Sequence, residues 1–198
     1  FGMSQADIST IATVASSTSM FTLPTGIIFD KWGPRAVCGV AFSILTIGWA
    51  LVALVLAGAI DGNTTTLSLI FVLCGWPTGS IDQGTLMPNL FLFPLNRGDV
   101  VVVQKVFMGL GASILTTVYI GVFDDDNLEG YCWFIAAGAA AMCAATVAVV
   151  RLPYDATQAD KLPEPTEEQL EMAKLVATRP APRSGFLVAF GILAGNII

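Results

Sequence analysis

The sequence predicts an all-α fold, a polytopic bundle of transmembrane helices, and three observations lead to this prediction. First, 55% of the 198 residues are hydrophobic and only 12% are charged, about half of the roughly 25% that is usual in soluble domains. Second, the apolar residues gather in runs long enough to cross a bilayer. Third, no run alternates polar and apolar residues as the strands of a membrane β-barrel do. A lipid-exposed backbone must satisfy its own hydrogen bonds, so each run is expected to be a helix.

Composition also argues against several classes of function. The net charge of −6 is unsuited to nucleic acid, because phosphate binding needs clustered Lys and Arg. The chain has no His, the commonest metal ligand and acid–base group at neutral pH. Its four cysteines include no CxxC pair and are interpreted as small buried side chains. We therefore expect no enzyme activity, no cofactor and no metal site.

About 20 apolar residues cross a hydrocarbon core of roughly 30 Å. Five complete runs meet this length, and a sixth begins at Phe186, where the sequence soon ends. Because the sequence also begins with Phe1 rather than Met, it is expected to be an internal fragment. The complete runs cover about residues 8–29, 36–60, 67–93, 100–123 and 131–150.

The basic residues predict how the runs are oriented. All nine Lys and Arg fall on one side of the five-run arrangement, which the positive-inside rule makes cytoplasmic. The loops on the opposite side hold Asp61, residues 124–126 and Glu129, and an acidic loop of this kind is usually only solvated. The basic residues are Lys31, Arg35, Arg97, Lys105, Arg151, Lys161, Lys174, Arg179 and Arg183.

The first, second and fifth runs differ in polarity. The first run is rich in Ser and Thr, and small hydroxyl residues let membrane helices approach closely. It is therefore expected in an interior seam. The second and fifth runs carry almost no polar side chains and are expected to contact lipid.

The third run is the most polar and holds the candidate site. Asp82 lies eleven residues before Phe93, about 16 Å from that end of a helix, which places it near the midplane. A carboxylate at this depth is costly and typically marks a pathway for an ion, proton or solute. The alternative is a protonated or amide-paired packing residue. Gln83 points about 100° away from Asp82. The candidate substrate- or ion-binding residues are Thr78, Asp82, Gln83 and Asn89.

Lys105 lies a few residues inside the fourth run, and its long stem can bring its charge to the cytoplasmic interface. After the fifth run, residues 152–185 contain five prolines and are interpreted as a linker. Within it, a capping box at 166–169 predicts a short amphipathic helix between Glu167 and Thr178. A plain solvated loop is the alternative.

Two motifs resemble a known family. The turn from Gly26 to Arg35 reads GIIFDKWGPR, similar to the signature between helices two and three of major facilitator superfamily transporters. A hairpin with a helix cap is the alternative. The turn FPLNRG at 93–98, followed by an apolar helix with GLGA at 109–112, resembles the nodulin-like branch of that superfamily.

This resemblance implies a 12-helix fold, of which the chain holds helices two to six and the start of helix seven. Residues 1–151 would form the first six-helix bundle without helix one, 152–185 the cytoplasmic linker and 186–198 the start of the second bundle. The signature would latch the two bundles on the cytoplasmic side, with Asn96, Arg97 and Gly98 in a neighbouring cytoplasmic turn. The signature residues are Gly26, Asp30, Lys31, Gly33 and Arg35.

The sequence thus favours a secondary active transporter of a small solute, working by alternating access and coupled to a proton or another ion. The alternative is a membrane scaffold or sensor that keeps the fold without moving solute. The expected partners are the lipid bilayer, a small solute and a proton or cation, with no nucleic acid. Location in the plasma membrane or an endomembrane, the solute and the oligomeric state stay open.

Overall fold

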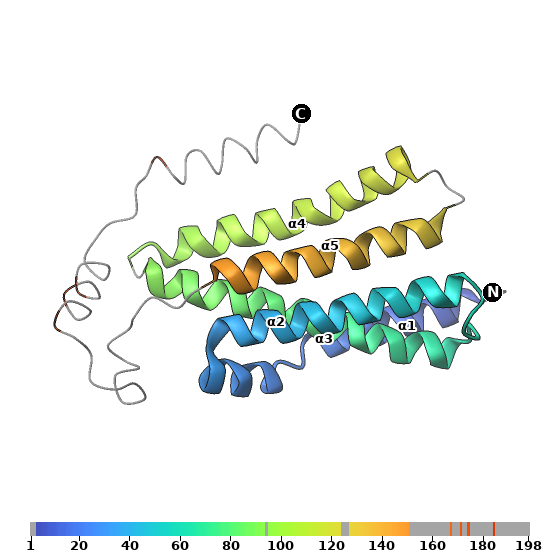
Figure 1. Ribbon diagram of the computed structural model, residues 1–198, viewed down its shortest axis with the longest axis horizontal. Coiled ribbons are helices and arrows are strands. Elements are labelled where there is room, and N and C mark those ends of the chain that lie inside the picture. The colour runs from blue at the N-terminus through green and yellow to red at the C-terminus, as the bar shows by residue number, and fades with distance from the viewer. Residues whose placement is uncertain are drawn as a thin grey trace. The chain divides into compact units, whose positions relative to one another are not determined.

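The computed structural model describes residues 3–93, 95–123 and 127–150, with Glu167, Glu171, Lys174 and Ser184 beyond them. Up to Val150, the regular elements of the described residues are all α-helices (Figure 1). This confirms the all-α prediction. The helices are α1 (Gln5–Ser19), α2 (Leu23–Leu56), α3 (Thr64–Leu92), α4 (Arg97–Val122) and α5 (Leu128–Val149).

Four helical stretches of the described chain are long and apolar enough to cross a membrane. The first of them, Gln5–Leu56, has 52 residues and would measure about 78 Å as one straight helix. A hydrocarbon core is only about 30 Å thick, so this stretch has to be folded back on itself. The other three are Thr64–Phe91, Arg97–Val122 and Leu128–Val149.

The chain divides into two compact units. The first comprises Phe1–Thr85 with Thr117–Val150, and the second Leu86–Thr116 with Arg151–Ile198. The expected linker at 152–185 and the expected start of a second bundle at 186–198 lie outside the described residues, apart from the four named above. Of the short helix expected in the linker, Glu167, Glu171 and Lys174 are described, and they are helical.

The first apolar run is not one continuous helix, and the expectation of a single span over 8–29 is wrong. Helix α1 ends at Ser19, and the chain leaves helical geometry before α2 begins at Leu23. Pro24 lies in the first turn of α2. Its ring would clash with the carbonyl of Met20 in a continuous helix, and it has no N–H to donate. Proline therefore starts a new helix here.

Helix α2 bends sharply inside the signature, where the sequence predicts a turn. Gly33 has φ 78° and ψ −179°, a conformation that is essentially confined to glycine. Residues 23–32 form a short helix before this kink, and Pro34 opens the long part of α2. At the far end, Gly58 has φ 76° and its N–H donates to the carbonyl of Val55 at 3.1 Å, which closes the helix.

Helices α1 and α3 of the first unit pack as a close parallel pair. The Asp7 carboxylate near the start of α1 is hydrogen-bonded by Thr64 at the start of α3. Further along, Gly75 and Gly79 lie so close to the carbonyls of Ala15 and Ser19 that neither position has room for a Cβ. This is a small-xxx-small seam of the kind that joins membrane helices, so the first run takes part in a close seam as expected. The glycines of α3 make this seam, however, and Ile11 is the one buried residue of α1.

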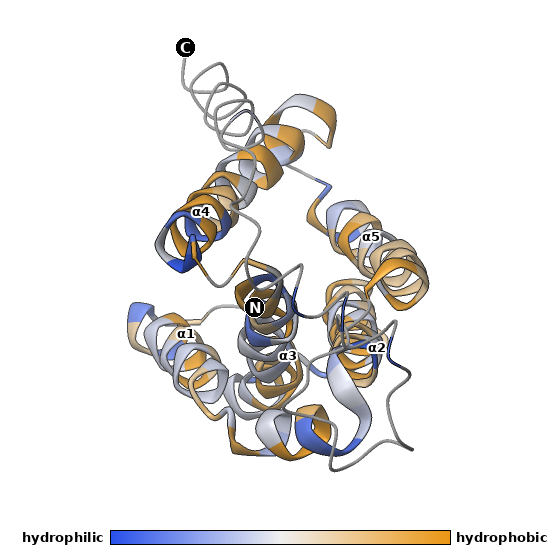
Figure 2. Ribbon diagram, turned by 90° about the vertical axis from the view of Figure 1, so that its left-hand side faces the viewer, coloured by the Kyte–Doolittle hydropathy of each residue, from blue (hydrophilic) through white to orange (hydrophobic). Residues whose placement is uncertain are grey.

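Helix α2 lies between two neighbours rather than facing lipid alone, as the end-on view shows (Figure 2). On one side, a Cβ at Gly48 would meet Cys74 of α3 at 2.7 Å; on the other, a Cβ at Gly39 would meet Val147 of α5 at 3.2 Å. The expectation of a lipid-facing second run is therefore wrong for these two faces. Membrane helices pack through small residues as well as polar ones, so a lack of polar side chains does not identify a lipid-facing helix.

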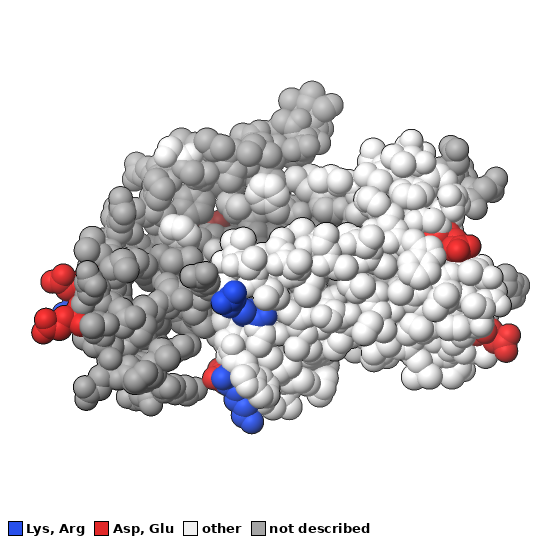
Figure 3. All heavy atoms as spheres, in the orientation of Figure 1, with Lys and Arg blue, Asp and Glu red and all other residues white. Residues whose placement is uncertain are grey.

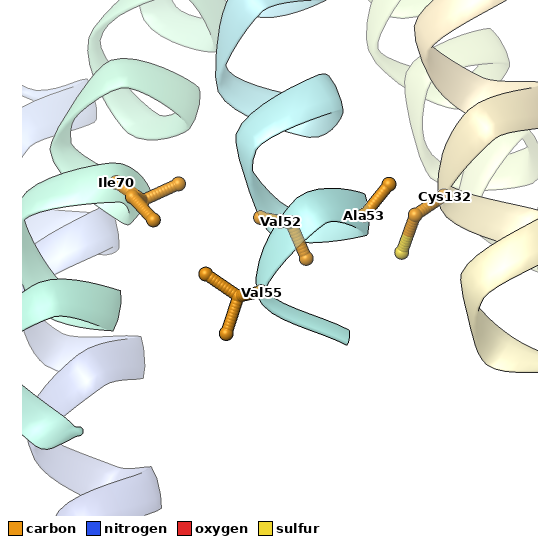
Figure 4. Packing of buried hydrophobic residues seen from close by; sticks show 5 residues of the cluster. All are labelled: Val52, Ala53, Val55, Ile70 and Cys132. Carbon is orange, nitrogen blue, oxygen red and sulfur yellow. The ribbon is translucent and has the colours of Figure 1, made fainter. Parts of the chain in front are cut away.

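The hydrophobic core of this unit lies at the end of α2 away from the kink (Figure 4). Val52 and Val55 face Ile70 of α3, while Ala53 of the same helix faces Cys132 of α5. Partly buried aromatic and aliphatic side chains surround this cluster, and Trp49 packs edge-on against Phe71 at a centroid distance of 6.4 Å. Helix α2 thus joins α3 and α5.

The charged residues of the first unit separate along the bundle (Figure 3). Lys31 and Arg35 lie on either side of the kink, with Asp30 next to them. Asp61 lies in the connection between α2 and α3, and Glu129 in the first turn of α5, at the opposite end of the antiparallel α2–α5 pair. Of the described residues in this unit, the basic ones are thus confined to the kink end.

A candidate polar surface on helix α3

Four polar residues of α3 form one stripe along the helix. Thr78, Asp82, Thr85 and Asn89 follow one another at spacings of four, three and four residues, which places them on one face. Asp82, Thr85 and Asn89 are half-buried, and Thr78 is exposed. We call these four residues the polar stripe. Three of them are predicted candidates, and the fourth, Thr85, was not predicted.

The polar stripe lies on the face of α3 that its neighbours in the first unit leave open. Gly75 and Gly79 face α1, while Cys74 and Gly84 face α2. Ser80 faces the short helix before the kink, where its hydroxyl is 2.6 Å from that of Thr25. At 100° per residue, every member of the stripe is about 140° to 180° from Ser80 around the helix axis. The stripe is therefore on the opposite side of α3 from this contact.

The hydroxyl groups of the stripe donate to their own helix. Thr78 Oγ1 donates to the carbonyl of Cys74 at 2.9 Å, and Thr85 Oγ1 donates to that of Ile81 at 2.9 Å. Each hydroxyl has one proton and two lone pairs, and in both residues the proton is used inside α3. With the Asp82 carboxylate between them and the Asn89 amide one turn further on, the stripe is rich in oxygen acceptors, which suits a cation or the donor groups of a polar solute.

Gln83 does not belong to this surface. It is three residues after Ser80, about 60° from it around the helix, on the side away from the polar stripe. The structure therefore separates Gln83 from the other candidates, as the 100° step predicts. Thr85 could have been found by the same reasoning, because it lies three residues after Asp82 and seven after Thr78.

The position of Asp82 along the bundle can be given relative to the end of α3 and relative to the kink of α2. It lies ten residues before Leu92, the last residue of α3, a distance of about 15 Å. However, Gly84, two residues further on, packs against Val37 and Cys38 in the first turn of α2 after the kink. Asp82 is therefore in the part of α2's span nearest Gly33.

The signature residues lie around the kink, but their contacts differ. Gly26, Asp30 and Lys31 are exposed, and the Lys31 ammonium lies 5.9 Å from the centre of the Trp32 ring. Gly33 makes the kink itself. Arg35 instead contacts α5, because its Nε and Nη2 donate to the carbonyl of Val147 at 2.9 and 2.6 Å. The structure thus gives Arg35 a partner inside the first unit.

The second motif forms the start of α4, within the second unit. The Asn96 N–H donates to the carbonyl of Phe93 at 3.1 Å, which closes the turn. Its side-chain amide donates to Asp99 at 3.2 Å, in the first turn of α4. Arg97 and Gly98 are exposed. The turn that the motif predicts is present.

A metal site would need several ligating side chains close together. No cluster of three or more His, Cys, Asp or Glu side chains occurs there. The four cysteines are free thiols, of which Cys38, Cys74 and Cys132 are buried. In the described part of the chain, the polar stripe therefore remains the main candidate site.

The long apolar helices of the described chain define a class, that of integral membrane proteins. The model of the Nodulin-like family matches residues 1–193. The chain therefore belongs to the Nodulin-like family, which confirms the resemblance found in its motifs. This family is typically transporter-like rather than enzymatic. Neither a curated protein nor a solved structure matches the chain.

Proposed function

We propose that this protein is a secondary active transporter that moves a small solute by alternating access, coupled to a proton or another ion. The observation that carries the proposal is the polar stripe of α3, with Asp82 inside a helix long and apolar enough to cross a membrane. Ionisable residues in such helices are costly and mark pathways for solutes and ions. Thr78, Asp82, Thr85 and Asn89 are the residues proposed to line the pathway.

The charge distribution supports an orientation for this pathway. In the first unit, the described basic residues Lys31 and Arg35 lie at the kink end, and the positive-inside rule makes that end cytoplasmic. Asp30 and Lys31 are exposed there. We propose that they belong to the latch that closes the cytoplasmic side, as the family resemblance implies. Arg35 would hold the kink against α5, and the turn at Asn96, Arg97 and Gly98 would also face the cytoplasm.

Transport by the complete protein in sealed vesicles tests this proposal. Candidate organic acids, metal ions and metabolites are offered under an imposed proton or sodium gradient, and uptake is compared between the wild type and Asp82→Asn. We expect gradient-driven uptake in the wild type and its loss or uncoupling in Asp82→Asn. Asp61→Asn makes the same chemical change outside the helices and should transport normally.

The result also separates the transporter from a scaffold or sensor. A scaffold would show no gradient-driven uptake of any solute, and Asp82→Asn would then change only assembly. Uptake that is identical in the wild type and Asp82→Asn at every pH would remove Asp82 from the pathway.

A further inference from the structure

The C-terminal end of α1 contacts α3 one helical turn before Asp82. The carbonyl of Ser19 contacts the backbone of Gly79 so closely that a Cβ would overlap it. Asp82 follows Gly79 by three residues, so it is one helical turn further along the same side of α3. At this level α1 has ended, because the chain leaves helical geometry between Ser19 and Leu23. Asp82 thus lies at the level of a helix end rather than of a helix flank.

This helix end presents backbone oxygens. The N–H of Met20 donates to the carbonyls of Ser17 and Thr18, and that of Phe21 donates to Thr18. Among the described residues, no N–H or O–H donates to the carbonyl oxygen of Ser19. The last carbonyls of a helix also carry the negative end of its dipole. In discontinuous membrane helices, such C-terminal ends coordinate Na⁺.

The hydroxyl groups near the end of α1, on α1 and on α3, all donate to carbonyls of their own helix. Thr18 Oγ1 donates to the carbonyl of Val14 at 2.6 Å, and Ser19 Oγ donates to that of Ser16 at 2.7 Å. Thr78 donates along its own helix in the same way. Since each proton is used inside a helix, the hydroxyl oxygens offer lone pairs outward. The junction therefore combines one carboxylate with neutral oxygen acceptors from two helices.

We propose that the end of α1 and Asp82 together form a binding site for a sodium ion. All the groups are oxygen ligands, the kind that hard cations take. A proton would bind to the carboxylate alone. A metal ion needs several oxygen ligands, and the carbonyl of Ser19 and the hydroxyl groups of Thr18, Ser19 and Thr78 would supply them. This inference rests on the proposed function and deepens it, because sodium would then be the coupling ion.

Thermal stability of the full chain in lipid nanodiscs tests the site without any solute. The melting temperature is measured against NaCl, with choline chloride holding the ionic strength constant, and KCl serves as a second salt. We expect NaCl to raise the melting temperature of the wild type in a saturable way and KCl to have a smaller effect. Asp82→Asn should abolish the sodium effect.

A pair of glycine variants tests the contribution of α1. Gly79→Ala pushes the Ser19 carbonyl away and should raise the sodium concentration of half-maximal effect about tenfold, as changes that misplace a metal ligand do. Gly138→Ala makes the same change in α5, where nothing lies within 4 Å of the added Cβ. It should leave the sodium titration unchanged. If Asp82→Asn does not fold, this pair still decides the question.

Three results would overturn the inference: no difference between NaCl and choline chloride, a sodium effect that survives in Asp82→Asn, or equal titrations for the two alanine variants. These results leave the proposed function intact if vesicle uptake follows a proton gradient. Loss of all uptake together with an intact sodium effect would instead overturn the transport proposal alone.

Discussion

Arg35 of the signature binds the last turn of α5, with Nη2 2.6 Å and Nε 2.9 Å from the carbonyl oxygen of Val147. These two residues are 112 positions apart in the sequence. Helix α5 ends at Val149, so the guanidinium lies where the terminal carbonyls lack partners and the helix dipole is negative. The kink of α2 is thereby attached to the end of α5.

Arg35→Ala should therefore loosen the α2–α5 junction. A hydrogen bond to a charged donor contributes about 1.5–3 kcal/mol when buried, and for this exposed pair we expect a loss of about 1 kcal/mol in the free energy of unfolding. Amide hydrogen exchange should also become faster in the last turn of α5. Lys31→Ala, on the other side of the kink, is the control. Equal exchange at Val149 and Val150 in both variants would show that the contact does not hold the helix end.

The two glycines of the signature should respond to alanine with opposite signs. Gly33 has φ 78° and ψ −179°, so Gly33→Ala should destabilise the protein by about 1–3 kcal/mol. Gly26 is inside the short helix, and nothing lies within 4 Å of a Cβ built on it. Gly26→Ala should stabilise that helix by about 0.5–1 kcal/mol. Denaturation of both variants in mild detergent measures the difference, and destabilisation of similar size in both would contradict the role of the kink.

Thr25 and Ser80 form a buried hydroxyl pair at 2.6 Å, with exposed fractions of 2% and 1%. Ser80 also donates to the carbonyl of Trp76 at 3.0 Å, so Thr25 supplies the proton between the two hydroxyls. A double-mutant cycle with Thr25→Val and Ser80→Ala should give a coupling energy of about 0.6 kcal/mol, the usual size between membrane helices. A coupling energy of zero would mean that the pair does not join the short helix to α3.

The sequence predicted much of this arrangement through periodicity and charge. Long apolar runs located the helices, and the signature from Gly26 to Arg35 located the turn in which α2 kinks. The small hydroxyl residues of the first run indicated a seam. The step of 100° per residue also predicted that Gln83 and Asp82 lie on different faces of the helix.

Other features depend on contacts that periodicity does not report. The break after Ser19 was missed because its residues are as apolar as a continuous span, although Pro24 carried the signal. The packing of α2 was not predicted, because a glycine within an apolar run, such as Gly39 or Gly48, does not indicate whether lipid or another helix lies against it. The partners of Arg35 and Thr25 lie 112 and 55 residues away, and no local pattern specifies a pairing at such separations.

The central claim is that the polar stripe of α3 faces an aqueous pathway through the membrane, and cysteine accessibility tests it most directly. In the full-length protein with its four native cysteines replaced, single cysteines are introduced at the stripe positions Thr78, Asp82, Thr85 and Asn89. Gln83 and Met87, on the other side of α3, receive the same change. A membrane-impermeant maleimide reacts with thiolates, which form in water and not in lipid.

We predict labelling at the four stripe positions, with the spacing of one helical face, and little at positions 83 and 87. A transported solute or the coupling ion should slow the labelling of the stripe. Labelling confined to positions 83 and 87, or equal at all six positions, would contradict the account.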